Sequence, residues 1–292
     1  MTFQGLLTAL VTPFRDGSVD EERFRAHVRR QVDAGVQGLV PCGTTGEAPT
    51  LSATEQAHIV GWTLEEAAGR VPVMAGIGSN CTATAVANAR RVEALGVQGV
   101  LATAPYYNKP TQEGLYQHFK TIAEAVSVEV CLYDVPGRSV VHIAPRTVAR
   151  LAEIENITAL KDATADLANA TDVRRRCGAR IALLSGDDFT TLPFLAQGGN
   201  GIISVASNVV PGHMRALVDA AKSGDVAKAS SLSERLFPLF RDLFLESNPI
   251  PVKAAMAHLG LIEDGLRLPM TPMTDGPRSG LHDTLDALQV ST

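Results

Sequence analysis

The sequence predicts a (β/α)8 barrel, the TIM-barrel fold, followed by a helical C-terminal extension. Short apolar runs alternate with segments of helical period, and their spacing of roughly 20 to 35 residues matches one βα unit. The runs are continuously apolar and rich in Val, Ile and Leu, which is typical of parallel strands covered by helices. They are GLLTALV from Gly5, VQGLVPC from Val36, VPVMAGI from Val71, VQGVLAT from Val97, VEVCLY from Val128, ITALK from Ile157, IALLSG from Ile181 and GIISVA from Gly201.

The segments between these runs carry helix start and stop signals. Asp20 is an N-cap candidate for a segment whose apolar residues recur with helical period. The SATE sequence of residues 52–55 is a capping box for the next helix. Gly35 and Gly96 follow two predicted helices, and VQG comes after each of them, which is a weak sign of a repeated unit.

The main alternative fold is an open, doubly wound sheet, which needs a glycine-rich phosphate turn after its first strand. The first apolar run instead passes into TPFRDGS, which lacks that fingerprint. After residue 222 the apolar runs stop, and DVAKASSLSERLFPLFRDLFLES and PIPVKAAMAHLGL have helical periodicity. We therefore expect a catalytic barrel over residues 1–222 and a helical extension over residues 223–292.

The charge balance argues against nucleic acid and membranes as partners. Lys and Arg number 26 against 31 Asp and Glu, so the net charge is −5, and the longest basic run is Arg174 to Arg176. A surface for nucleic acid or anionic lipid would need a basic patch. No stretch approaches the roughly 18 apolar residues of a membrane-spanning helix.

The cysteines and the N-terminal segment predict a cytoplasmic protein. Cys42, Cys81, Cys131 and Cys177 are scattered without a CxxC pair, as in proteins whose thiols stay reduced. The opening MTFQGLLTALVTPF has no basic stretch and no small-residue cleavage site, so we interpret it as mature chain.

Chemically interesting residues gather where the predicted strands end. In a barrel, these ends and the loops after them carry the active site. Lys161 ends the ITALK run and Tyr133 ends the VEVCLY run, while GTTGE (43–47), PYYNKP (105–110) and GDD (186–188) follow three other strands. An enclosed pocket would disfavour the charged ammonium, so a neutral Lys161 amine could attack a carbonyl and form a Schiff base.

Structural explanations remain open for the same residues. Thr44 and Thr45 could only stabilise a turn, and Tyr106 and Tyr107 could only be packing residues. Asp188 is as consistent with a helix N-cap as with a catalytic acid.

Nothing in the sequence supports a cofactor. GGNG from Gly198 precedes the last predicted strand, at the bottom of the barrel, where a structural turn is expected rather than a phosphate loop. No GxxxxGK[ST] motif is present, so nucleotide binding is unsupported. The seven histidines show no HxxxH or HExxH spacing, so we expect no metal.

Taken together, the motifs resemble those of the 4-hydroxy-tetrahydrodipicolinate synthases (dihydrodipicolinate synthases), in the N-acetylneuraminate lyase superfamily of Schiff-base aldolases. The likeness extends over nearly the whole chain, in GTTGE, TAPYYNKPTQEGLYQHF, LYDVPGR, LKDAT, LLSGDD, GGNGIISV, NPIPVK and LRLPMTP. It implies a lyase of diaminopimelate and lysine biosynthesis that joins pyruvate to L-aspartate 4-semialdehyde. It also implies a homotetramer built from tight dimers.

The resemblance assigns catalytic roles by matching motif. Lys161 would carry pyruvate as a Schiff base that becomes an enamine, and Tyr133 would be the general acid and base. Thr44 and Tyr107 would complete a hydroxyl relay with Tyr133. One residue of the tyrosine pair crosses the dimer interface in the family, and we expect Tyr106 to be that residue here.

Substrate-binding roles follow in the same way. Thr45 matches the residue that binds the pyruvate carboxylate, and Gly186 and Ile203 match residues that line the same pocket. Arg138 matches the residue that grips the carboxylate of the semialdehyde, which suits a bidentate guanidinium.

The chain departs from the family pattern near that arginine. Asp134 stands where Asn is usual, Ser139 and Val140 stand where Thr-Gly is common, and Asp162 stands where Glu is frequent. The alternative function is therefore a sibling Schiff-base aldolase or dehydratase that acts on a sugar acid or keto acid, although Arg138 counts against it. A catalytically silent barrel that binds pyruvate-like ligands is a third hypothesis.

Lysine inhibits many members of the family at a dimer-interface site near Tyr106 and Asn80. This chain keeps both residues but has Ala53, Gln56 and Thr84 where feedback-sensitive relatives supply histidine and glutamate. A desolvated ammonium needs an acidic partner, so we expect weak or absent inhibition by lysine.

Overall fold

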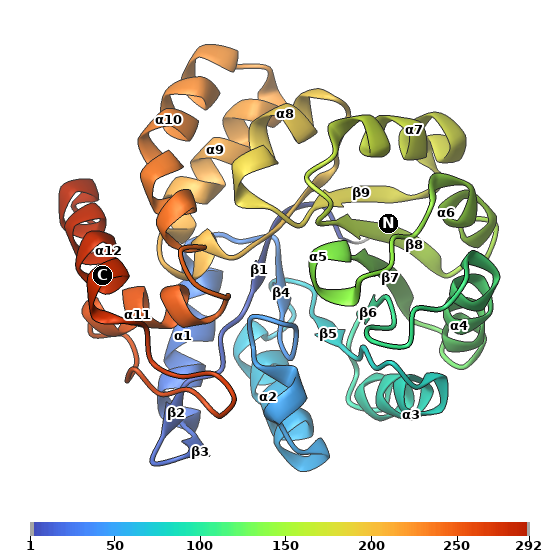
Figure 1. Cartoon of the computed structure of the whole chain (residues 1–292), viewed down its shortest axis with the longest axis horizontal. Helices are drawn as coiled ribbons and strands as arrows, with labels where there is room; N and C mark the ends of the chain where they lie inside the picture. Colours follow the sequence, from blue (N-terminus) through green and yellow to red (C-terminus); the bar gives the residue numbers. More distant parts are fainter. Residues whose placement is uncertain (1–2, 291–292) are drawn as a thin grey trace.

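The structure confirms the predicted barrel (Figure 1). It is a computed structural model and describes residues 3–290. The barrel strands are β1 (Gly5–Ala9), β4 (Gly38–Val40), β5 (Met74–Gly76), β6 (Gly99–Thr103), β7 (Glu129–Asp134), β8 (Ile157–Asp162), β9 (Ala182–Ser185) and β10 (Gly201–Ser204). Within the described range these eight strands are parallel, in the order β4-β1-β10-β9-β8-β7-β6-β5. A parallel bridge between Leu39 and Val73 links the two ends of that order, so the sheet closes.

Side chains fill the inside of the barrel. One buried cluster occupies the interior and includes Leu7, Met74, Tyr133 and Ile203. A second, larger cluster fills the layer between the strands and the helices. Because the interior is a packed core, space for a ligand is expected at the C-terminal ends of the strands.

Helices surround the sheet, and their ends follow the signals in the sequence. As predicted, Asp20 caps α1 by accepting a hydrogen bond from a first-turn N–H, and Ser52 and Glu55 form the capping box of α2. Gly35 and Gly96 follow α1 and α3 with positive φ, which suits glycine. The helices are α1 (Glu21–Asp33), α2 (Ala53–Ala67), α3 (Thr82–Glu93), α4 (Gln112–Glu124), α5 (Pro136–Ser139), α6 (Pro145–Leu151), α7 (Leu167–Cys177), α8 (Thr191–Ala196), α9 (Pro211–Ser223), α10 (Val226–Asp242), α11 (Ile250–His258) and α12 (Asp275–Leu288).

A small hairpin between β1 and α1 was not predicted. Its strands, β2 (Phe14–Arg15) and β3 (Ser18–Val19), are antiparallel. Asp16 and Gly17 at the turn have φ values of 51° and 77°, as a type I′ turn requires. Asp-Gly is the signal for such a turn, but strands of two residues are too short to show a periodic pattern.

Three helices follow the last barrel helix and pack beside the barrel (Figure 1). α10 contacts α9 and α12, and α11 contacts α12. The segment between α10 and α11 returns to the barrel, where Asn248 and, on α11, Lys253 are buried. Across residues 3–290, no helix combines the length and apolar character needed to cross a bilayer.

Candidate active site

Lys161 and Tyr133 lie side by side at the ends of neighbouring strands. They are register partners between β8 and β7, and such partners direct their side chains to the same face of the sheet. Each residue is only 5% exposed. The Lys161 Nζ lies 4.2 Å from the centroid of the Tyr133 ring, a favourable cation–π distance. The lysine therefore turns into the barrel and does not extend into solvent.

A cavity of about 290 Å³ adjoins this pair. Its walls come from the ends of β4, β7, β8, β9 and β10 and from the segment between α10 and α11. Six of the predicted site residues meet there, namely Lys161, Tyr133, Thr44, Thr45, Arg138 and Gly186. Eight residues without a predicted role also line it, among them Val205, Phe244 and Asn248.

Gly186 must be glycine because it lies against the lysine stem. A Cβ at this position would lie 3.1 Å from the Lys161 Cε and 2.7 Å from the Ala163 Cβ. The second distance is shorter than ordinary packing permits. The predicted role of Gly186 as a wall of the lysine pocket thus has a steric basis.

Ile203 and Asn80 do not line this cavity. Ile203 is fully buried in the interior cluster with Tyr133, and Val205, two residues later, reaches the wall. Asn80 is half-buried, and its carbonyl accepts a hydrogen bond from Asn108 Nδ2 at 2.8 Å.

The two adjacent tyrosines lie in different surroundings within one chain. Tyr106 lines an adjoining cavity of about 250 Å³, which shares Thr44, Val135 and Arg138 with the first. Tyr107 is 87% exposed with a φ of 71° and lines neither cavity. Within one chain, Tyr107 therefore does not reach the buried Tyr133. Adjacent residues of a loop point in directions that the backbone decides, and sequence spacing does not show them.

Asn248 connects Thr45 to Arg138 and had no predicted role. Its Nδ2 donates to Thr45 Oγ1 at 2.9 Å, and its carbonyl accepts a hydrogen bond from Arg138 Nη2 at 2.8 Å. One residue of the extension thus orients two of the predicted substrate-binding side chains. NPIPVK was the only signal for it, and that motif says nothing about contacts with residues 200 positions away.

Lys253 and Glu47 form a buried ion pair beneath the GTTGE loop. Lys253 Nζ lies 2.6 Å from Glu47 Oε1 and donates to the Thr12 carbonyl at 2.8 Å. The two side chains are 0% and 2% exposed. Burial lowers the pKa of Lys253, and the Glu47 carboxylate opposes that shift. The backbone N–H of Arg267 donates to the second Glu47 oxygen, so the loop that carries Thr44 and Thr45 is tied to the extension.

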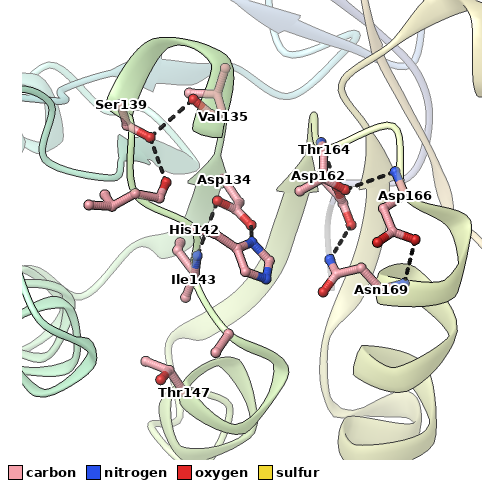
Figure 2. A network of polar contacts seen from close by, with 12 residues as sticks. Asp134, Val135, Ser139, His142, Ile143, Thr147, Asp162, Thr164, Asp166 and Asn169 are labelled. Carbon is pink, nitrogen blue, oxygen red and sulfur yellow. Dashed lines mark hydrogen bonds and ion pairs between the residues drawn. The ribbon is translucent and has the colours of Figure 1, made fainter. Parts of the chain in front are cut away.

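Asp134 and Asp162 lie next to Tyr133 and Lys161 but belong to the layer outside the barrel (Figure 2). Asp134 Oδ2 lies 2.7 Å from His142 Nδ1, and its Oδ1 accepts a hydrogen bond from the Ile143 N–H at 3.2 Å. Burial raises the pKa of Asp134, and the hydrogen bond with Asp134 raises the pKa of His142. Asp162 accepts hydrogen bonds from Thr164 and Asn169. Neither carboxylate lines the lysine cavity.

Asp188 is not the helix cap, and it does not line the Lys161 cavity. Asp187 makes the cap, because its carboxylate accepts a hydrogen bond from the Phe189 N–H. Asp188 is buried and accepts hydrogen bonds from Ser204 Oγ at 2.6 Å and from two backbone N–H groups after β10. Burial raises the pKa of Asp188 to about 6. Its role is to fix the chain after β10.

GGNG is the structural turn that was expected. Gly198 has a φ of 90°, and Asn200 Oδ1 accepts hydrogen bonds from the Leu183 N–H at 2.9 Å and from Arg174 Nη2 at 2.6 Å. The turn precedes β10, at the end of the barrel opposite to Lys161.

Comparison with known proteins decides the family. The model of the dihydrodipicolinate synthetase family matches residues 2–288. The chain belongs to this family. A 4-hydroxy-tetrahydrodipicolinate synthase of Nitratidesulfovibrio vulgaris is 50% identical, covering 98% of this chain and 99% of its own. One of Pelobacter propionicus is 48% identical, covering 96% of each chain.

A solved structure of the family agrees in fold and extent. Dihydrodipicolinate synthase from Acinetobacter baumannii, complexed with pyruvate, superposes with a TM-score of 0.97 at 38% identity and covers 100% of both chains. The predicted resemblance, the barrel fold and the expectation of a lyase-type enzyme are therefore confirmed at the level of the dihydrodipicolinate synthetase family.

Proposed function

We propose that this chain is a 4-hydroxy-tetrahydrodipicolinate synthase that condenses pyruvate with L-aspartate 4-semialdehyde through a Schiff base on Lys161. The observation that carries the proposal is the buried Lys161 amine beside Tyr133, in a cavity that Thr45 and Arg138 also line. A lysine in such a place can be a nucleophile toward a carbonyl. The names of the full-length relatives support the same reaction.

The chemistry follows from the positions of these groups. The Lys161 amine attacks the pyruvate carbonyl carbon and loses water, which leaves an imine. Tyr133, next to it, accepts and returns the protons that these steps require. Loss of a methyl proton then gives an enamine whose carbon adds to the aldehyde carbon of the semialdehyde. The semialdehyde amine finally attacks the imine carbon, which closes the ring and releases Lys161.

Arg138 favours a second substrate with a carboxylate. Arg138 lines both cavities, and one nitrogen of its guanidinium donates a hydrogen bond to the Asn248 carbonyl. A carboxylate can pair with the remaining N–H groups. A sibling aldolase for sugar acids or keto acids is the alternative, and turnover of aspartate semialdehyde compared with sialic acid and sugar acids distinguishes the two.

We further propose a cytoplasmic homotetramer built from tight dimers, with residues 1–222 as the catalytic barrel. The exposed Tyr107 would then enter the site of a neighbouring subunit and complete the relay of Thr44 and Tyr133 there. The extension, residues 223–292, would support the barrel through Asn248 and Lys253.

Trapping with borohydride tests the proposal. Reduction in the presence of pyruvate is expected to add mass to the peptide that contains Lys161, because only an imine is reduced to a stable amine. Lys253 is a matched control, since it is also a buried lysine. Labelling at Lys253, Lys109 or Lys120 in place of Lys161 would refute the assignment.

We expect L-lysine to inhibit weakly or not at all. Gln56 borders the Tyr106 cavity, but its amide already contacts Arg91 Nη2 at 3.3 Å and the Ala48 carbonyl at 3.3 Å. Arg91 places a positive charge where the lysine ammonium would need a negative one, and Thr84 supplies none. Titrating L-lysine into the steady-state assay measures the effect. Near-complete inhibition at sub-millimolar lysine would contradict it.

A further inference from the structure

The loop that carries Arg138 starts and ends on one carboxylate. It leaves β7 at Asp134, forms the single turn of α5, and returns to Asp134 through the His142 ring and the Ile143 N–H (Figure 2). Asp134 is 1% exposed. The carboxylate therefore closes the base of the loop, and Arg138 lies in the middle of it.

The same loop contains a strained residue. Val140 has a φ of 64°, a conformation that is a genuine outlier for a β-branched residue. Its side chain is 62% exposed, so burial of that side chain does not compensate. Residues in such conformations persist only where the surroundings hold them.

Hydrogen bonds hold the loop at several points, among them Gln112 Nε2 to the His142 carbonyl at 2.7 Å and Arg138 Nη2 to the Asn248 carbonyl at 2.8 Å. The Ser139 hydroxyl is buried and lies within hydrogen-bond distance of the Val135 carbonyl at 3.0 Å and the Val141 carbonyl at 2.8 Å. The Asp134–His142 pair then fastens the far end. We call the Asp134–His142 pair the clasp of this loop. Two departures from the family pattern thus belong to one loop: Asp134 is part of the clasp, and Val140 is the strained residue.

The charges around the clasp favour its ionised form. Three carboxylates act on the His142 ring, namely Asp134 on β7, Asp162 on β8 and Asp166 at the start of α7. Each favours the imidazolium, so the pKa of His142 lies above its ordinary value. The imidazolium in turn offsets the cost of burying the Asp134 carboxylate, whose own pKa is raised mainly by burial and, in addition, by Asp162.

We propose that the Asp134–His142 pair positions Arg138. The pair holds the strained loop 135–142, and the loop keeps the Arg138 side chain at the cavity. The pair thereby sets the KM for the aldehyde substrate. This inference rests on the proposed function. Neither Asp134 nor His142 touches the cavity, so both act through Arg138. The attraction between the two opposite charges is lost as the pH rises through the pKa of His142, because the ring becomes neutral while the Asp134 carboxylate stays ionised.

Kinetics of His142→Ala test the proposal. The variant is expected to raise the KM for aspartate semialdehyde about tenfold, the effect of losing one favourable charge pair. The KM for pyruvate and the borohydride trapping at Lys161 should stay within about twofold of the parent, in line with a surface-scale perturbation. In the parent protein the semialdehyde KM should rise as the pH passes through the pKa of His142. His142→Ala should not show this rise.

Two further variants separate positioning from general damage. His258→Ala removes another His–Asp pair, with Asp286 at 3.0 Å on α12, and should leave both KM values unchanged. Val140→Gly removes the strain, because glycine adopts positive φ freely, and should lower the semialdehyde KM of His142→Ala toward the parent value.

Different results overturn different claims. An unchanged semialdehyde KM in His142→Ala, or an equal loss for both substrates without rescue by Val140→Gly, would overturn the positioning role. A parent protein that traps no pyruvate would overturn the proposed function instead. Amide exchange over residues 135–143 still tests the clasp in that case, because exchange should be faster in His142→Ala than in the parent, and equal exchange would refute it.

Discussion

Replacing Arg138 with alanine is expected to raise the KM for aspartate semialdehyde about 100-fold while the reaction of Lys161 with pyruvate survives. Arg138 Nη2 is already bound to the Asn248 carbonyl at 2.8 Å, so the remaining N–H groups are the ones available to the substrate. Hydrogen bonds to a charged group contribute about 1.5–3 kcal/mol, and two of them account for the expected loss. Steady-state kinetics with each substrate varied in turn measures it.

Two matched variants sharpen the Arg138 experiment. Arg138→Lys keeps the charge but loses the fork geometry, so its KM should fall between those of the parent and Arg138→Ala. Arg146→Ala removes an exposed arginine from α6 and should leave both KM values unchanged. Normal handling of the semialdehyde by Arg138→Ala would make the arginine structural and would favour the sibling-aldolase alternative.

Replacing Lys253 with methionine is expected to lower the free energy of unfolding by about 3–5 kcal/mol. The ammonium is paired with Glu47 at 2.6 Å in a place where both side chains are buried. Removing one partner leaves the other charge in the interior without compensation, which is the costly case. Denaturant unfolding at a fixed protein concentration measures the change.

A double-mutant cycle tests the origin of that loss. Lys253→Met combined with Glu47→Gln removes both charges, and the amide oxygen of the introduced glutamine can still accept the hydrogen bond that the Arg267 N–H donates to Glu47. The double variant should therefore be more stable than Lys253→Met alone. Lys120→Met removes a partly exposed lysine paired with Glu124 and should change stability by less than about 0.5 kcal/mol. If the losses of unfolding free energy in Lys253→Met and Glu47→Gln simply added up in the double variant, the ion pair would not be the cause of the loss in Lys253→Met.

Local patterns predicted most of the fold because the interactions involved are local. A strand that is buried on both faces must be apolar throughout, and a helix end must satisfy its own N–H groups nearby. The strand ending at Lys161 and the caps at Asp20 and Ser52 could therefore be recognised from a few neighbouring residues. Active sites of such barrels lie at the C-terminal ends of the strands. This predicts that Lys161, Tyr133, Thr44 and Arg138 meet at one face, and they line one cavity there.

By itself, the sequence determined the order of the barrel strands, the family and six residues that meet at the Lys161 cavity. The tertiary structure alone decided which contacts support that centre. Asn248 meets Thr45, and Lys253 meets Glu47, across more than 200 residues of chain, and no local pattern records such a pairing. It also decided that Tyr107 is exposed while Tyr106 lines a cavity, because the direction of a loop side chain depends on backbone angles that long-range packing sets.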